Sequence, residues 1–347
     1  MVGIASDASG MRSELRIDLG ALRRNVQVLR RAAEGAELWA VVKANGYGHG
    51  AVDVAGAALD AGATALCVAT VPEALELRPQ FAEVRIVVFG PAGNRETALA
   101  READLELVLS TGELPPGIRV HLKLDTGMGR WGLSELVAPG EGVVGLMSHL
   151  ATADTDPAFA ETQIERFRAA TEQYGHLTRH LANSAGTLRF PSAHLDAVRC
   201  GIALYGLSPF GTDPADDGLE PVLSWTSELA LVRKLHAGES TGYGRRFVAE
   251  RDTWIGIVPV GYADGFRREL TGTEVRVAGE PRPVVGTVSM DAFAVELDRE
   301  LPVGAPVVLV GHGVLADAHA RVAGTIPHDF ISGITSDPTR SRRIVVD

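Results

Sequence analysis

Short apolar runs alternate with longer amphipathic segments between residues 15 and 205. The runs are about five to eight residues long, as buried strands are, and several intervals between them repeat apolar residues at helical spacing, as at Leu22, Val26 and Leu29. Eight runs have this character: Leu38–Lys43, Ala65–Ala69, Arg85–Gly90, Leu105–Leu109, Ile118–Asp125, Val143–His149, Thr178–Asn183 and Ala197–Gly201.

Eight strands alternating with helices predict an α/β protein built on a (β/α)8 TIM-like barrel rather than an open doubly wound sheet. A dinucleotide-binding sheet would carry a G-x-G-x-x-G sequence after its first strand, and the glycines after Lys43 do not have that spacing. We therefore predict a barrel domain over residues 13–222.

The pattern changes after residue 222, where short apolar or alternating runs are separated by Gly or Pro and helical periodicity is largely missing. This predicts a C-terminal, mainly β domain over residues 223–347, reached through a loop at residues 214–218. Its expected strands lie within Val222–Leu235, Thr253–Val260, Val275–Val277, Val284–Met290 and Val307–Val310.

Composition narrows the function classes. A net charge of -11 over 347 residues argues against nucleic acid, and we interpret the basic run Arg340–Arg343 as a solvated terminal segment. The two cysteines, Cys67 and Cys200, cannot form a disulfide framework and indicate a reducing compartment. No signal peptide, membrane span or metal-ligand spacing is visible, so we expect a soluble cytoplasmic protein without a metal site.

The most informative single residue is Lys43, which ends the first run and precedes Ala-Asn-Gly-Tyr-Gly-His-Gly. Burial of an ammonium is costly and depresses its pKa, which turns a lysine into a nucleophile or a base. The glycines at 46, 48 and 50 allow a tight turn or a close approach to a ligand. A Schiff-base lysine and an exposed lysine before a glycine-rich loop both fit this segment.

Polar residues also end other runs, and in a (β/α)8 barrel the C-terminal strand ends form the active site. Taken singly, His149 could be a core histidine, Asn183-Ser184 a helix cap and Arg199 a partner of any carboxylate. Their common placement predicts an electropositive mouth for a phosphorylated ligand, with a lysine at its centre. The residues concerned are Lys43, Tyr47, Lys123, Arg130, His149, Asn183, Ser184 and Arg199.

These segments resemble the alanine racemases over nearly the whole chain, beginning with Val41–Gly50, which is similar to the family's pyridoxal phosphate (PLP) attachment motif. The other matching segments follow in the family's order: Lys123–Arg130, Ser148–Asp154, Ala182–Ala185, Val198–Ile202, Gly242–Gly244, Gly261–Gly265 and Ser289–Asp291. The resemblance implies a PLP-binding barrel followed by a β domain, with residues 1–12 packing against that β domain.

The resemblance also implies PLP-dependent interconversion of L- and D-alanine, with D-alanine supplied for peptidoglycan. Lys43 would attach PLP and act as one base, and Tyr243 would be the second base, reaching the site from the other subunit of a homodimer. Further cofactor contacts would come from Tyr47, His149, Asn183, Ser184, Arg199, Gly201 and Ile202. Substrate contacts and the entrance would involve Arg130, Met290, Asp291 and Tyr262, and Lys123 matches a lysine that is often carbamylated.

One departure from the family pattern concerns the C-terminus. Relatives carry a tyrosine there that touches the phosphate and narrows the entrance, whereas this chain reads Thr335–Arg340 and Tyr262 is its last tyrosine. We therefore predict a looser gate and a broader substrate range. The alternatives are a serine, lysine or broad-range racemase, a PLP decarboxylase and a non-catalytic PLP-binding homeostasis protein. The last needs no second base, and the decarboxylase should have an acidic residue in place of Arg199.

Overall fold

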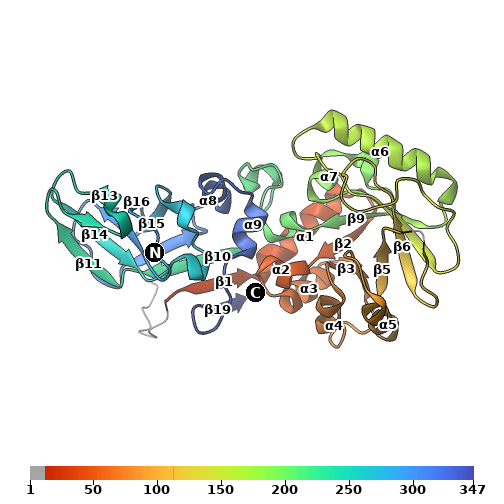
Figure 1. Ribbon diagram of the computed structural model, residues 1–347, viewed down its shortest axis with the longest axis horizontal. Helices are drawn as coiled ribbons and strands as arrows, with labels where there is room; N and C mark the ends of the chain where they lie inside the picture. The colour runs from red at the N-terminus through yellow and green to blue at the C-terminus, as the bar shows by residue number, and fades with distance from the viewer. Residues whose placement is uncertain (1–11, 112) are drawn as a thin grey trace. The chain divides into compact units, whose positions relative to one another are not determined.

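The computed structural model describes residues 12–111 and 113–347, which form two compact units (Figure 1). One unit runs from Leu19 to Glu220, and the other comprises the chain from Pro221 to Asp347 together with the N-terminal segment that ends at Asp18. Each helix in the described part of the chain is too short or too polar to cross a membrane.

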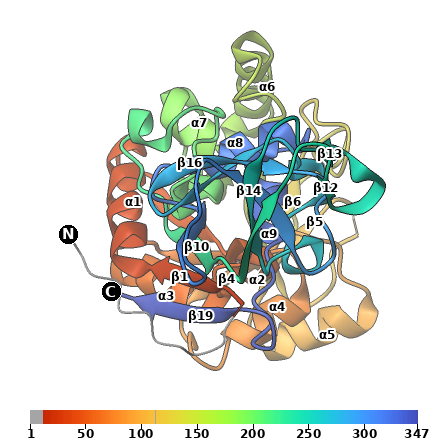
Figure 2. The same cartoon turned by 90° about the vertical axis from the view of Figure 1, so that its left-hand side faces the viewer.

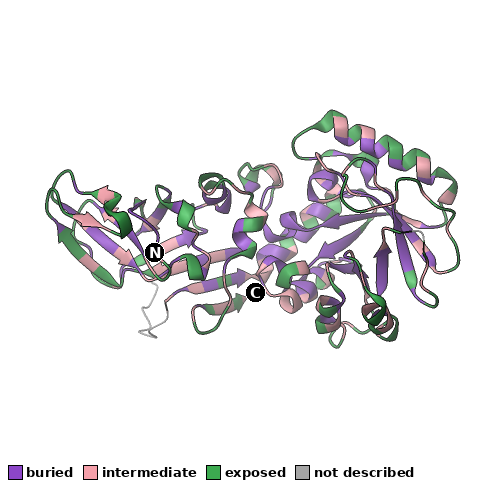
Figure 3. Cartoon of the chain, in the orientation of Figure 1, coloured by how far each residue is buried: buried purple, intermediate pink, exposed green. Residues whose placement is uncertain are grey.

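The first unit is a closed barrel of parallel strands, in which each strand pairs with the next along the chain and β9 pairs with β2. Both faces of these strands are buried, which explains why the sequence shows continuous apolar runs instead of alternation (Figure 3). The eight predicted runs are confirmed as β2 (Glu37–Val41), β3 (Ala65–Val68), β4 (Arg85–Val88), β5 (Glu106–Leu109), β6 (Arg119–Lys123), β7 (Val143–Met147), β8 (Thr178–His180) and β9 (Ala197–Cys200).

Helices cover the barrel except after β5 and β6, where the described residues of the connections form none. The predicted stripe Leu22, Val26 and Leu29 is the buried face of α1. The helices of this unit are α1 (Leu19–Ala32), α2 (Lys43–Tyr47), α3 (Ala51–Asp60), α4 (Val71–Leu77), α5 (Asn94–Glu102), α6 (Pro157–Thr171) and α7 (Ser184–Arg189), with short 3-10 turns η1 (Glu172–Tyr174), η2 (Pro191–Ala193), η3 (Ile202–Tyr205) and η4 (Pro214–Asp217).

The second unit is built on a nine-stranded sheet in the order β11-β14-β17-β16-β15-β18-β10-β1-β19. The expected run Val222–Leu235 contains two strands, because the chain turns at Leu229 and Ala230, whose N–H groups bond elsewhere in the sheet. The strands are β1 (Glu14–Asp18), β10 (Leu223–Glu228), β11 (Leu231–Leu235), β14 (Thr253–Val258), β15 (Glu274–Val277), β16 (Glu280–Val285), β17 (Phe293–Leu297), β18 (Pro306–Val310) and β19 (Arg342–Val346).

Smaller elements complete this unit. A hairpin of two short strands precedes β14, and two short helices, which the sequence pattern did not predict, lie between β18 and β19. They are β12 (Ser240–Thr241), β13 (Phe247–Val248), α8 (Ala316–Val322) and α9 (Pro327–Ser332), with 3-10 turns η5 (Tyr243–Arg245), η6 (Tyr262–Asp264) and η7 (Arg268–Leu270).

Both ends of the described chain join this sheet. Strand β1 pairs with β10 and, in parallel, with β19, beside which it lies in both views (Figures 1 and 2). The first unit therefore begins at Leu19, later than the predicted boundary at residue 13, because Leu15 and Ile17 bury their side chains in the sheet. The interpretation of Arg340–Arg343 as a solvated tail is wrong, since Arg342 and Arg343 begin β19. The prediction for residues 1–12 lies outside the described residues, apart from Arg12.

Asn25 ties α1 to the end of the first unit. Its amide donates to the carbonyls of Leu204 and Glu220 over 3.1 and 2.8 Å and accepts the Glu220 N–H over 2.8 Å. We predict that Asn25→Ala lowers the free energy of unfolding by about 3 kcal/mol, because it leaves buried backbone groups unpaired. Gln27→Ala on the same helix removes one part-buried bond, to the Ala61 carbonyl, and should cost less than about 1 kcal/mol in urea titrations. Equal losses in the two variants would contradict this assignment.

Candidate active site

The structure places the predicted barrel residues at the C-terminal ends of its strands. Lys43 follows β2, Lys123 ends β6, and His149 lies just beyond β7. Asn183 and Ser184 connect β8 to α7, and Arg199 lies in β9 directly before the turn that contains Gly201 and Ile202. Because parallel barrel strands end on one face, these side chains share one mouth.

A left-handed turn follows Lys43. Ala44, Asn45 and Tyr47 have φ of 52°, 52° and 51°, and the predicted glycines Gly46, Gly48 and Gly50 also have positive φ. A non-glycine residue in this region costs about 1–2 kcal/mol, so the surroundings must hold the turn. They do so through Glu73, whose Oε1 accepts the Ala44 N–H over 2.8 Å, and through Asn45 Oδ1, which accepts the Ala51 N–H over 3.0 Å.

Glu73 was not among the predicted site residues. It lies on α4, where Thr70 and Glu73 form a capping box, and its Oε2 accepts the N–H groups of Ala69 and Thr70. The Thr-x-x-Glu spacing could have revealed the cap. It could not reveal that the second carboxylate oxygen of Glu73 reaches across to the backbone of Ala44, next to Lys43.

Two of the three lysines in the chain lie at the barrel mouth. Burial, followed by the charge of Arg130, lowers the pKa of Lys43, and the Glu73 carboxylate opposes this shift. Burial and the charges of Arg199 and Arg130 lower the pKa of Lys123 to about 8. Both amines are therefore neutral more often than an exposed lysine, and a neutral amine is the form that attacks a carbonyl carbon.

Hydroxyl and amide donors converge beside Lys43. Ser184 Oγ accepts the N–H groups of Gly201 and Ala203 over 3.0 and 3.3 Å, and the Ile202 N–H has no acceptor among the described residues. A methyl group on Gly201 would come within 2.6 Å of the Tyr47 hydroxyl, so only glycine fits there. Burial raises the pKa of Tyr47, which keeps its hydroxyl protonated. A phosphate group suits these donors.

Asn183 has a structural role in this cluster. It is the N-cap of α7, where its Oδ1 accepts the Gly186 N–H over 2.9 Å and its amide nitrogen lies 3.5 Å from the Leu150 carbonyl. The helix-cap interpretation of Asn183 is therefore confirmed. Its direct contribution to a ligand stays a prediction.

Arg199 is a buried cation held by neutral acceptors. Its Nη1 donates to His180 Nδ1 over 2.8 Å, and its Nη2 bonds the carbonyls of Ser148 and Leu181 and His149 Nδ1. Burial lowers the pKa of Arg199 to about 10, so it remains charged at neutral pH, and burial beside Arg199 lowers the pKa of His149 well below its usual value. No carboxylate bonds Arg199 in the described part of the chain.

The other predicted residues lie on loops of the second unit, and three of them are exposed apolar or aromatic side chains. Tyr243 is 72% exposed, Met290 53% and Tyr262 44%. The segment 286–291 connects these loops: Thr287 Oγ1 donates to the Tyr243 carbonyl over 3.0 Å, and the Tyr262 N–H donates to the Ser289 carbonyl over 3.1 Å. The structure thus brings Tyr262, Met290 and Asp291 together and places Tyr243 along the same segment.

Arg340, in the region where relatives carry the tyrosine, fastens two of these loops. Its guanidinium pairs with both carboxylate oxygens of buried Asp264 over 2.7 and 3.1 Å and with Asp291 Oδ1 over 2.8 Å. Arg12 Nη2 also donates to the Asp291 carbonyl over 2.6 Å. The loop bearing Tyr262 and the segment bearing Met290 are therefore held by the C-terminal segment.

The contact between Glu73 and the turn after Lys43 can be tested by titration. We predict that Glu73→Gln lowers the pKa of Lys43, because the lost negative charge favoured the ammonium. With isotope-labelled lysine, the three lysines can be titrated separately by NMR, and Glu76→Gln on the exposed side of α4 is the matched control. An unchanged or raised pKa of Lys43 in Glu73→Gln would contradict the assignment.

Comparisons with known proteins agree with this geometry. The chain matches the family model described as alanine racemase, N-terminal domain, over residues 17–209 and that described as alanine racemase, C-terminal domain, over residues 222–342. An alanine racemase of Symbiobacterium thermophilum is 39% identical over 95% of this chain and 97% of its own length.

Solved structures are similar throughout. Alanine racemase from Streptomyces coelicolor A3(2) has a TM-score of 0.88 at 39% identity, with 99% of this chain and 100% of that one covered. The enzyme from Bartonella henselae, with covalently bound pyridoxal phosphate, has a TM-score of 0.85 at 26% identity, with 96% and 99% covered. The resemblance found in the sequence is confirmed: the chain belongs to the alanine racemase family of amino-acid isomerases.

Proposed function

We propose that this protein is a PLP-dependent racemase that interconverts L- and D-alanine, provides D-alanine for cell-wall peptidoglycan and works as a homodimer. One observation carries the proposal: a lysine with a lowered pKa lies beside a phosphate-type donor set at the C-terminal end of a parallel barrel. The covalently bound PLP of the Bartonella henselae relative supports the choice of cofactor.

The residues at the mouth fit PLP by chemistry. Lys43 offers an amine to its aldehyde, and the hydroxyls of Tyr47 and Ser184 with the amides at 201 and 202 offer donors to its phosphate. Arg199 offers only donors to the pyridine nitrogen, which would therefore stay unprotonated. When bound, PLP supplies an electron-withdrawing ring that makes the α-proton of an attached amino acid acidic, and an unprotonated ring does so weakly. A weak electron sink disfavours transamination.

Lys43 acts first as a nucleophile and then as a base. Its Nζ would hold the cofactor through the aldehyde carbon and, once the substrate amine has taken that place, would take or return the α-proton on one face of the substrate. The pKa lowered by burial and Arg130 favours the neutral amine needed for both roles. The left-handed turn at residues 44–47, held by Glu73, sets the direction from which Lys43 approaches.

Tyr243 is the proposed second base, contributed by the partner subunit of the dimer. Racemisation moves a proton off one face and returns it to the other, so an acid–base group is needed on each face. The 72% exposure of Tyr243, and the exposed Met290 and Tyr262 near it, support a surface that another subunit covers. His149, bonded to Arg199, would link the Tyr243 hydroxyl to the cofactor ring.

Arg130 and Lys123 are proposed to act on the substrate carboxylate. Arg130 would bind it as a cation, while Met290 and Asp291 would approach from the partner subunit. Lys123 would orient Arg130 once carbamylated, and the pKa of about 8 supports this because carbon dioxide reacts with a neutral amine.

The proposal is tested by chiral chromatography of L-alanine incubated with the protein, with and without PLP, beside L-serine and L-lysine. We expect rapid, PLP-dependent formation of D-alanine. Turnover of the larger amino acids at comparable rates would support the broader substrate range predicted from the missing tyrosine, and strict alanine preference would contradict that prediction. No turnover of any of the three would favour a PLP-binding protein without catalysis.

The two-base assignment is tested by Tyr243→Phe, with Tyr174→Phe as the control on the barrel surface. We expect the Tyr243 variant to lose about 100-fold or more of its racemisation rate in both directions, because each direction needs both bases, with Lys43 still binding PLP. Solvent deuterium incorporation measures proton removal from each enantiomer separately, and it should be lost only for the enantiomer whose α-proton Tyr243 removes. Wild-type rates in both directions would refute the second base.

A further inference from the structure

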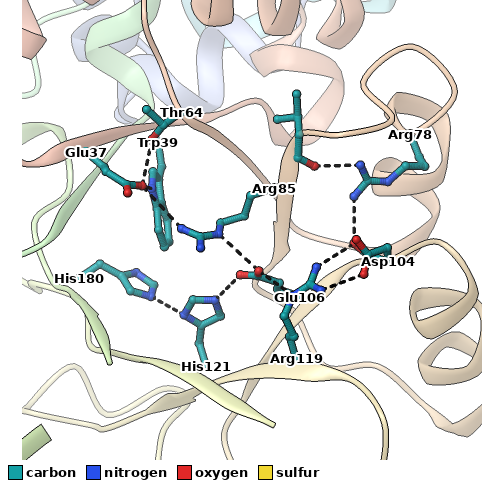
Figure 4. A network of polar contacts seen from close by, with 11 residues as sticks. Glu37, Trp39, Thr64, Arg78, Arg85, Asp104, Glu106, Arg119, His121 and His180 are labelled. Carbon is teal, nitrogen blue, oxygen red and sulfur yellow. Dashed lines mark hydrogen bonds and ion pairs between the residues drawn. The ribbon is translucent and has the colours of Figure 1, made fainter. Parts of the chain in front are cut away.

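A chain of buried polar side chains crosses the barrel beneath Arg199. His180 Nδ1 lies 2.8 Å from Arg199 Nη1, His180 Nε2 lies 2.9 Å from His121 Nδ1, and His121 Nε2 lies 2.8 Å from Glu106 Oε2. Glu106 is the first residue of β5, so the chain runs from the N-terminal end of the barrel to its mouth. Figure 4 shows the part from His180 to Glu106, with the two imidazoles aligned between the strands. None of these three residues was predicted from the sequence.

Because Arg199 can only donate, every hydrogen bond in this series has a defined donor and acceptor. A guanidinium has no acceptor, so His180 Nδ1 must accept and His180 Nε2 must carry the hydrogen. His121 Nδ1 then accepts from His180, and His121 Nε2–H donates to Glu106. Burial lowers the pKa of both histidines, which keeps the rings neutral and each of them in one tautomer.

The carboxylate is kept ionised at the far end. Burial alone would raise the pKa of Glu106, but the hydrogen bond from His121 and the charge of Arg85 outweigh it and bring the pKa to about 2. Glu106 Oε1 accepts a hydrogen bond from Arg119 Nε over 3.0 Å and forms an ion pair with Arg85 Nε at 3.3 Å, which leaves Oε2 for His121. As an acceptor at every pH above this value, Glu106 can only receive the His121 hydrogen.

Neighbouring residues pack closely against the two rings. A methyl group on Gly145 would overlap the His121 ring, so β7 must carry glycine there. Trp39 packs against His180 at 4.6 Å between ring centroids and meets the His121 ring edge-on at 5.8 Å. The Trp39 indole N–H is itself held by Glu37 over 2.7 Å.

The hydrogen-bond chain acts on the Nε–H donor of Arg199 by fixing the orientation of the guanidinium. Four acceptors engage Nη1 and Nη2, whereas the Nε–H has no acceptor among the described residues. If His121 and His180 took the other tautomer, a His180 Nδ1–H would face the Nη1–H of Arg199. Two donors at 2.8 Å repel, and the guanidinium would turn away from its present orientation.

We infer that Glu106 is a positioning residue for Arg199: acting through His121 and His180, it fixes the tautomer that lets Arg199 bond His180 and keep its Nε–H for the cofactor ring. The identity of that ligand rests on the proposed function. The direction of the hydrogen bonds does not rest on the proposed function, since it follows from residues of this protein alone.

Neutron diffraction on the cofactor-loaded wild-type protein tests the direction without a variant and without an assay. We expect deuterium on Nε2 and none on Nδ1 of both His121 and His180. Deuterium on Nδ1 of either ring would overturn the inference, whether or not the protein racemises alanine. Failure of the proposed function alone would appear as correct tautomers in a protein without racemase activity.

The effect on Arg199 is tested with Glu106→Gln against Glu83→Gln, the same change on an exposed carboxylate just before β4. A glutamine at 106 must either turn its NH₂ toward Arg85 and Arg119 or offer it to His121 and reverse the chain. We expect kcat to fall about 10- to 100-fold with KM little changed, as for outer-shell partners of other sites. We also expect the absorption spectrum of bound PLP to change and more turnovers to end in transamination. Glu83→Gln should stay within about twofold of wild type.

Equal kinetics and equal spectra in the two variants would overturn the positioning role. A loss of folding in Glu106→Gln would be seen in its circular dichroism. The tautomers of His121 and His180 in the wild-type protein would then decide whether the hydrogen bonds run from Arg199 to Glu106 as inferred. A fall in activity shared by both variants, with an unchanged spectrum, would show a structural effect of the strand ends and would also overturn the inference.

Discussion

The buried guanidinium of Arg199 is the constraint on which the barrel mouth depends. A cation in a barrel interior must be matched by acceptors, and here these are two imidazoles and two backbone carbonyls. A carboxylate at the same place would have paired with Arg199 and become a competing anion beside the ligand. Because its acceptors are neutral, Arg199 keeps its positive charge. The carboxylate that balances this charge belongs to Glu106, which lies two imidazoles away at the other end of the barrel.

The backbone after Lys43 is a second constraint, of a different kind. Three non-glycine residues with positive φ are unfavourable in themselves, yet they form the turn that follows Lys43. Lys43 thus lies between the buried strand β2 and this turn. The bonds from Glu73 and Asn45 offset part of that strain. The Glu73 carboxylate therefore has two effects: it holds the turn and it limits the fall in the pKa of Lys43.

The strands and site residues that could be predicted are those that produce a recognisable pattern in the neighbouring sequence. Barrel strands were predictable because burial on both faces makes them continuous apolar runs, and Lys43, His149 and Arg199 because they end such runs. Strand β19 was not, since its Arg342 and Arg343 looked solvated until pairing with β1 supplied a partner strand. The motif segments carried the resemblance that the family comparisons confirm.

Long-range partners left no pattern of this kind. His121 and His180 lie inside apolar runs, where alternation is lost and the inward face of a strand cannot be identified. Glu73 and Glu106 act on residues 29 and 15 positions away, a relation that arises only when neighbouring barrel strands pair. Asn25 likewise reads as an ordinary polar residue of α1 until the carbonyls of Leu204 and Glu220 come to lie beside it.

In the C-terminal segment that lacks the tyrosine, ion pairs of Arg340 hold the loops of the second unit. Arg340 pairs bidentately with Asp264, a carboxylate only 1% exposed, and reaches Asp291, whose side chain is 55% exposed. Asp264 also accepts the Gly261 N–H over 2.8 Å, whereas solvent screens the ion pair between Arg340 and the exposed Asp291. The Tyr262 loop is thus fixed by Asp264, while the Asp291 end can yield. This difference between the two ends is the physical basis for the looser gate expected from the sequence, and the broader substrate range stays a prediction.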